Sequence, residues 1–214
     1  MAGRRKENAE VRGSHADRTA SMRKRVIDAA IECLGKLGYN ATTFQVVTDA
    51  ADVSRGAMLH HFPSRVDLMV AVAEYAAERQ NRYVRRRLVD VKPGMDRYLA
   101  ITQATWDAMA RPPAIALLEV LAAARSDKEL GARISPVLEG LEKASADAVW
   151  EQAQSAGITD KASIDAMTHL HIAAMRGLAL TAPFLRGQAR NEASVDLLRR
   201  YKRGLTNELL GRKG

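Results

Sequence analysis

Two short helical segments separated by three residues restrict most strongly how this chain can fold. The first, about residues 44–51, follows a pair of threonines, and the second, residues 55–61, follows Ser54. Threonine and serine are common helix N-caps. Pro63 ends the second segment, because the residue before a proline is driven out of the α region. Neither segment is long enough to be stable alone in water, so both need a packing partner.

The preceding segment supplies that partner. Apolar residues recur at helical spacing from Val26 to Leu37. Gly38 follows the last of them, where a C-terminal residue of positive φ belongs. The segments together predict a three-helix unit of roughly 45 residues that contains a helix-turn-helix at about 43–62. Residues 64–67, Ser-Arg-Val-Asp, have the form of a capping box that opens a further helix running to about Leu88.

The rest of the chain has a helical period and no sustained alternation typical of strands. Further helices are expected at 94–110, 113–124, 127–156, 160–183 and 192–210. Pro136 is expected to kink the third of these or to start a new helix after Ser135. The predicted fold is all-α, with a three-helix helix-turn-helix DNA-binding domain followed by a larger helical bundle that binds ligand and dimerises. The expected divisions are a basic, flexible leader at 1–20, the DNA-binding domain at 21–67 and the bundle at 68–214.

Positive charge is concentrated at the start of the chain. The net charge is +8 and the pI is about 9.9. Residues 1–25 hold eight basic side chains against three acidic ones. Such a leader suits a phosphate backbone, although a solvated, disordered tail explains the composition equally well. A second basic group at 79–92 lies at the end of a long helix, where the helix dipole favours cations, and is interpreted as a solvated face.

Several classes of protein are disfavoured by what the sequence lacks. Cys33 is the single cysteine, so an intrachain disulfide framework is excluded. No apolar run approaches the ~18 residues that cross a bilayer, and the polar first 25 residues do not form a secretory signal, so no membrane partner and a cytoplasmic location are expected. No catalytic motif appears, and His169 and His171 point apart on a helix. We expect no enzymatic activity, no cofactor and no metal site.

The second short helix has the residues that reading DNA requires. A helix-turn-helix lays this helix in the major groove, which favours small residues at its start and outward donors. A glycine such as Gly56 destabilises a helix by ~1 kcal/mol relative to alanine. A close approach to DNA would explain why a glycine is present here. Arg55 matches a guanine edge, and the two histidines match bases or phosphates, although a partly packed helix end is the alternative for them. On these grounds the DNA contacts are Thr42, Thr43, Ser54, Arg55, Gly56, Ala57, His60 and His61.

The segment from Val26 to Val72 resembles the DNA-binding domain of the TetR (tetracycline repressor) family. The resemblance lies in the CLGKLGY helix end, in ATT before the second helix, in VSRGAMLHHF and in FPSRVDL. It implies that Thr43 caps the second helix and contacts phosphate, and that residues 55–57 begin the base-reading helix. It also implies that Arg65 grips phosphate and that the basic leader acts as an arm along the minor groove. Arg23 and Arg25, just after the leader, are further expected DNA contacts.

Two positions depart from the family's pattern. The family usually has a tyrosine where this chain has Leu59, so one hydrogen bond to phosphate is missing. It usually has a glycine in the turn where this chain has Asp52. Aspartate tolerates left-handed backbone angles better than most residues, so the turn is expected to survive with some strain.

The resemblance also implies a dimer and a ligand. One helix-turn-helix domain makes few base contacts. A dimer compensates by placing two such domains on a palindromic operator, which is double-stranded DNA with half-sites ~34–36 Å apart. The last two long helices are the expected homodimer interface, with packing inside the chain as the alternative. A small, largely apolar effector is expected to release the DNA, so the protein is interpreted as a repressor. The expected pocket residues are Trp106, Met109, Leu117, Leu121, Met167, His171 and Met175.

Two other classes of protein remain in competition. A ligand-binding helical bundle with no DNA function would leave Gly56 and the basic leader unexplained. An enzyme would need a nucleophile with its base, or a metal cluster, in a recognisable setting.

Overall fold

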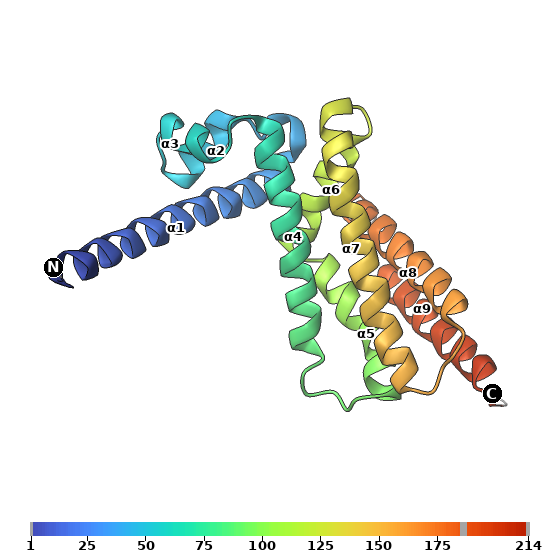
Figure 1. Ribbon diagram of the computed structural model, residues 1–214. Coiled ribbons are helices and arrows are strands. Elements are labelled where there is room, and N and C mark those ends of the chain that lie inside the picture. Colours follow the sequence, from blue (N-terminus) through green and yellow to red (C-terminus); the bar gives the residue numbers. More distant parts are fainter. Residues whose placement is uncertain (1, 185–187, 213–214) are drawn as a thin grey trace.

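The computed structural model describes the backbone of residues 2–184 and 188–212, and the side chains of residues 19–184 and 190–212. Within these ranges the protein is all-α, as predicted (Figure 1). The helices are α1 (Ala2–Ala41), α2 (Phe44–Ala51), α3 (Arg55–His61), α4 (Arg65–Arg87), α5 (Met95–Met109), α6 (Pro112–Ala124), α7 (Lys128–Ser155), α8 (Lys161–Thr181) and α9 (Gln188–Leu209).

Helices α1 to α3 form the three-helix unit that the sequence predicts. Gly38 interrupts α1 with φ 77° and ψ 174°, a backbone conformation that favours glycine. Met58 of α3 and Phe62 just after it are 1% and 2% exposed and pack into the same core as α1. This burial fixes α3 on α1 and leaves the opposite face of α3 outward. In Figure 1 the two short helices lie along α1, at one end of the molecule.

The three-helix unit of α1, α2 and α3 (the head) and the bundle of α4 to α9 share one hydrophobic core. Helix α4 begins at the predicted capping box, in which Ser64 and Asp67 bond each other's backbone N–H groups. Helices α1 and α4 both pack against α6, and buried residues from all three belong to a single cluster. Tyr39 N, at the end of α1, donates to the Glu119 carboxylate of α6 at 3.0 Å. The three-helix unit of α1, α2 and α3 is therefore connected to the bundle through α6.

The bundle helices follow the predicted ranges closely, with two local differences. Helix α7 runs as one helix through Pro136, so no new helix begins after Ser135. The loss of one hydrogen bond at a proline is offset here by packing of α7 on both sides of it, at Ile134 and Leu141. Residues 126–129, Ser-Asp-Lys-Glu, have the form of a capping box with Ser126 as the cap, whereas the N-cap of α7 is Asp127, whose carboxylate accepts from Leu130 N at 3.0 Å.

The first helix begins earlier than the sequence suggested. A start near residue 20 was expected, whereas the backbone is helical from Ala2. The segment contains no proline and is rich in good helix formers such as alanine, arginine and glutamate. The side chains before residue 19 lie outside the described ones, so the flexibility of the leader and its DNA contacts stay predictions. Across the described ranges no helix has the length and apolar character to span a membrane.

Candidate DNA-binding surface and ligand cavity

The start of α2 separates the two threonines into different roles. Thr43 is exposed, and its hydroxyl accepts from Val46 N at 3.3 Å as the N-cap. Thr42 is fully buried, and its hydroxyl donates to the Gly38 carbonyl at 2.7 Å. Thr43 is therefore open to a phosphate. Thr42, which was predicted to contact DNA, is occupied inside the protein at the end of α1.

The first turn of α3 is open to solvent. Ser54 caps it by accepting from Ala57 N at 3.2 Å, and Arg55 and Gly56 are both exposed. A Cβ added at Gly56 would have no neighbouring atom within 4 Å. Packing against the described side chains therefore does not require a glycine at position 56. The space that the missing side chain leaves is open to solvent.

The two histidines at the end of α3 point in different directions. His60 is exposed, whereas His61 is half-buried between His60 and Phe62. The His61 Nε2 atom is buried and has no hydrogen-bond partner within the described part of the chain. Burial lowers the pKa of His61, and the neighbouring His60 and Arg23 lower it further. His61 is thus largely a packing residue, which was the alternative for this pair, while His60 remains open to DNA.

Three basic residues surround the helix-turn-helix, and each is held by a contact within the protein. The Arg65 guanidinium lies 4.1 Å from the centroid of the Tyr39 ring and donates to the Tyr39 carbonyl oxygen. Arg25 donates to the carbonyl of Asp52 at 3.2 Å, and Arg23 lies over Phe62 at 5.5 Å. Asp52 has φ 50° and ψ 58°, so the turn is left-handed as expected for a position usually held by glycine. Arg65 is half-buried and thus less available to phosphate than predicted.

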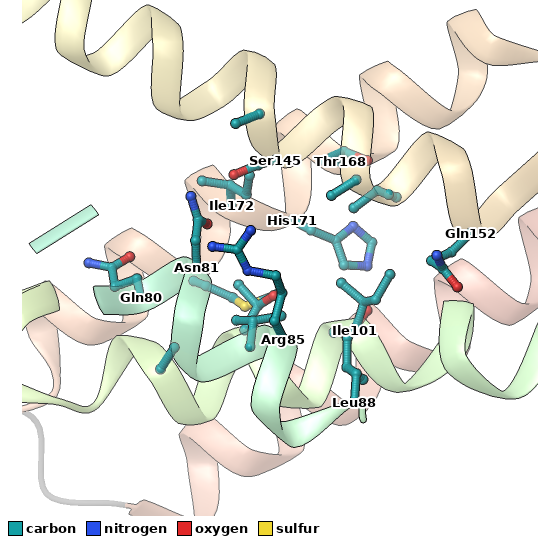
Figure 2. A pocket seen from close by; sticks show the side chains of 18 of the residues that line it. Gln80, Asn81, Arg85, Leu88, Ile101, Ser145, Gln152, Thr168, His171 and Ile172 are labelled. Atoms are coloured by element: carbon teal, nitrogen blue, oxygen red, sulfur yellow. The ribbon is translucent and has the colours of Figure 1, made fainter. Parts of the chain in front are cut away.

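A cavity of about 530 Å³ lies between α4, α5, α7, α8 and α9. Met109, Met167, His171 and Met175, four of the residues predicted for a ligand pocket, line it. The other three lie elsewhere: Leu117 and Leu121 pack on α6 into the core shared with the head, and Trp106 packs in a small cluster with its neighbours. Helical spacing in the sequence does not distinguish residues that line the cavity from residues that pack in a hydrophobic core. Figure 2 shows side chains of α4, α5, α7 and α8 projecting into the same space.

His171 of α8 lies where α8 packs against α9 at the edge of the cavity. It is 5% exposed, and its Nδ1 and Nε2 atoms lie 2.9 Å and 3.0 Å from the carbonyl oxygens of Met167 and Leu198. A neutral imidazole donates only one hydrogen bond, so both contacts are satisfied only in the protonated ring. Burial nevertheless lowers the pKa of His171. By contrast His169 is exposed, so the two histidines point apart.

Lys202 of α9 also lines the cavity and was not among the residues predicted for it. It is 2% exposed, and its Nζ donates to the Tyr98 carbonyl of α5 at 2.5 Å and lies 3.9 Å from the Tyr98 ring centroid. Burial lowers the pKa of Lys202 to about 7. A signal existed in the sequence, because Lys202 interrupts an otherwise apolar stripe at helical spacing, between Leu198 and Leu205.

The outward face of α8 and α9 differs from the one expected. The sequence predicts that a stripe on α9 faces a partner, with the residues Val195, Leu198, Tyr201, Leu205 and Leu209. Tyr201 is exposed, whereas Val195 is buried and the three leucines pack inside the chain. The other large apolar side chains that α8 and α9 expose are Leu170, Leu180 and Leu197. Of the small residues expected to allow close helix approach, Ala173, Gly177 and Ala182 are exposed.

Comparison with known proteins shows what the helix-turn-helix segment and the fold are similar to. The model of "Bacterial regulatory proteins, tetR family" matches residues 26–72. The transcriptional regulator CymR of Pseudomonas putida is 36% identical over 85 residues, which cover 40% of this chain and 42% of that protein. The transcriptional repressor KstR of Mycobacterium tuberculosis is 42% identical over 59 residues, which cover 28% and 26%. The solved structure of Salmonella enterica GusR shares the fold, with a TM-score of 0.62 at 22% identity over 89% of this chain and 96% of that one.

The fold and the matched segment define a protein with a helix-turn-helix DNA-binding domain. The helix-turn-helix part of the chain is similar to the tetR family of bacterial regulatory proteins. The sequence matches to these two curated relatives span less than half of the relatives' own length.

Proposed function

We propose that this protein is a homodimeric transcriptional repressor that binds a palindromic operator through α3 and is released by a small, largely apolar effector in the bundle cavity. The observation that carries the DNA-binding part is the open first turn of α3. Arg55 is exposed there, and Gly56 provides clearance that no contact inside the described structure uses. Exposed Thr43 lies at the N-terminus of α2, where the positive end of the helix dipole suits a phosphate.

The exposed apolar face of α8 and α9 supports the dimer. Leu170 and Leu180 on α8 lie beside exposed Ala173 and Gly177, and a Cβ at Gly177 would meet nothing within 4 Å. Small residues allow helices of a second copy to approach closely, and a two-fold axis would present two α3 helices to one face of the DNA.

The shared core supports communication between ligand and DNA. The cavity is bounded by α4, α5, α7, α8 and α9, and α4 and α7 belong to the same core as α1 and α6. A ligand that favours one arrangement of these helices would move the two heads relative to each other. It would release DNA only to the extent that it binds the two arrangements with different affinity.

Binding to genomic DNA fragments by Gly56→Glu and Arg55→Ala variants tests the assignment of α3. The matched control is Gly140→Glu, an exposed glycine within α7 that also has no neighbour within 4 Å of an added Cβ. Loss of sequence-specific binding is expected in the two α3 variants and not in the control. Binding by Gly56→Glu and Arg55→Ala equal to that of the parent would refute the helix-turn-helix assignment.

A further inference from the structure

The charged groups around the bundle cavity are unbalanced. Four basic side chains line it, from Arg85, Arg97, Arg176 and Lys202, against the single carboxylate of Glu151. Arg176 is neutralised by Glu142 at 2.8 Å, and Arg97 donates twice to the Val91 carbonyl. Of the described residues none forms an ion pair with Lys202 or with Arg85. The cavity therefore has an excess of positive charge.

Lys202 is the most costly of these groups for the protein to bury. It is 2% exposed, and its partners are the carbonyl oxygen and the ring of Tyr98, neither of which carries a full negative charge. A charged ammonium buried without an anion is strongly unfavourable, so such a group loses its proton or acquires a counter-ion. An ammonium has three donors, and the Tyr98 carbonyl and ring occupy two directions, which leaves one for a ligand.

His171 of α8 contacts α9 one helical turn before Lys202. Its Nε2 contacts the carbonyl of Leu198, four residues before Lys202, and Lys202 itself disfavours the protonated ring. An anion at this corner would favour protonation of both groups. It would also satisfy both carbonyls that face the imidazole, since the protonated ring donates twice.

From this geometry we propose that the effector is an organic monocarboxylate with an apolar body, whose carboxylate pairs with Lys202 beside His171. The inference rests on the proposed function, which assigns the cavity as the effector site. The apolar body fits the methionine and isoleucine walls, which include Met109, Met175, Ile101 and Ile172. A single unpaired buried cation favours a ligand with one negative charge over a phosphate ester with two. A volume of about 530 Å³ lies within the ~300–1,000 Å³ of small-molecule sites.

Binding of the carboxylate should be accompanied by proton uptake. In the free protein burial holds the pKa of Lys202 at about 7, so at pH 8 the amine is largely neutral. The titratable groups that face it are Tyr98 on α5 and His171 on α8, and the remaining charged groups of the cavity are the three arginines and Glu151. A bound carboxylate stabilises the ammonium, so the amine takes a proton from the buffer: R–COO⁻ + Lys202–NH₂ + H⁺ gives the pair R–COO⁻···⁺H₃N–Lys202.

Calorimetry with three matched probes tests the proposal on the full-length parent protein. The probes are straight-chain carboxylates of six to fourteen carbons, their primary amides and their primary amines. The titrations are made at pH 8 in buffers of low and high ionisation enthalpy. We expect at least one acid to bind at least 10-fold more tightly than its amide and to take up between about 0.5 and 1 proton, because a charged hydrogen bond adds ~1.5–3 kcal/mol. We expect no binding of the amines.

The Lys202→Met variant tests whether Lys202 causes the preference for the acid and the proton uptake. Lys161→Met, at an exposed position of α8, is the control. In Lys202→Met the acid and the amide should bind equally and without proton uptake, whereas the control should behave as the parent does. The comparison of probes in the parent needs no variant, so it holds even if Lys202→Met fails to fold.

Three outcomes would overturn the proposal: equal binding of acid and amide by the parent, tighter binding of an amine, or no binding by any acid. Each would leave the repressor assignment standing if operator binding is intact. Acid binding without any operator binding would instead refute the repressor assignment and keep the carboxylate site.

Discussion

Lys202 and Tyr98 connect α9 to α5 twice, through a hydrogen bond of 2.5 Å to the Tyr98 carbonyl and through a 3.9 Å contact with the Tyr98 ring. His171 makes a comparable link from α8 to α9 at the Leu198 carbonyl. Helices α8 and α9 also carry the proposed dimer face. A ligand bound between Lys202 and His171 would therefore act directly on the helices that carry the proposed dimer interface.

Replacing Lys202 should change how stability depends on pH. The pKa is about 7 in the folded protein and near 10.5 when unfolded, so the unfolded chain binds the extra proton between these values. The contribution of Lys202 to the free energy of unfolding therefore rises with pH in this range, by up to ~1.4 kcal/mol per unit. Lys202→Met should be more stable than the parent near pH 7, with an advantage that shrinks towards pH 9.5. Denaturant unfolding at several pH values measures the difference.

The same substitution at Lys161, which is exposed and paired with Asp165, provides the comparison for that experiment. A pH-independent difference between Lys202→Met and the parent would mean that Lys202 remains charged in the folded protein, which contradicts the predicted titration.

Charge on the exposed face of α9 should disrupt the dimer. Leu197 is 59% exposed, so Leu197→Glu should leave the fold of one chain intact while it places a buried, unpaired carboxylate in the proposed interface. Sedimentation velocity should show a shift from dimer to monomer. Val89→Glu, at an apolar position outside α8 and α9 that is 68% exposed, should stay dimeric. An unchanged dimer in the Leu197→Glu variant would place the interface elsewhere.

Removal of residues 1–18 should flatten the salt dependence of operator binding. Each phosphate contact by a basic side chain releases counter-ions, so the slope of log K against log salt reports their number. The parent and the shortened chain are compared over ~50–200 mM salt by fluorescence anisotropy. Identical slopes would mean that the leader makes no phosphate contacts.

Leu59→Tyr should strengthen operator binding. Leu59 is 40% exposed at the outer face of α3, where a phenol would reach solvent and, in the complex, a phosphate. One added hydrogen bond is worth about 1 kcal/mol, or roughly a fivefold gain in affinity. Leu59→Phe, which adds the ring without the hydroxyl, is the control in the same binding titration. If the two variants bind equally, the hydroxyl contributes no contact.

The elements of the fold were predictable because local signals mark their ends. The Gly38 kink, the Thr43 and Ser54 caps, the Ser64–Asp67 capping box and the left-handed Asp52 all lie where the sequence placed them. Each of these depends on residues close together in the chain, which a sequence displays directly.

The burial of individual side chains was less predictable, because it depends on packing between distant segments. Thr42 and Thr43 are adjacent and chemically alike, but α1 covers only the first. Arg85 belongs to the basic group interpreted as a solvated face, and it is exposed but also lines the cavity. Leu117 has the same helical spacing as a pocket residue but faces the shared core. Which face of a helix meets a cavity is decided by the bundle as a whole.

Selection of genomic fragments by the purified parent protein, followed by footprinting of the enriched DNA, tests the central claim most directly. A dimer that reads DNA through α3 should enrich one inverted repeat and protect two half-sites ~34–36 Å apart, or a multiple of that distance, on the same face of the duplex. Enrichment should disappear with Gly56→Glu and persist with Gly140→Glu. Fragments without a shared symmetric sequence, or the same enrichment by the Gly56→Glu variant, would contradict the assignment of α3 as the operator-reading helix.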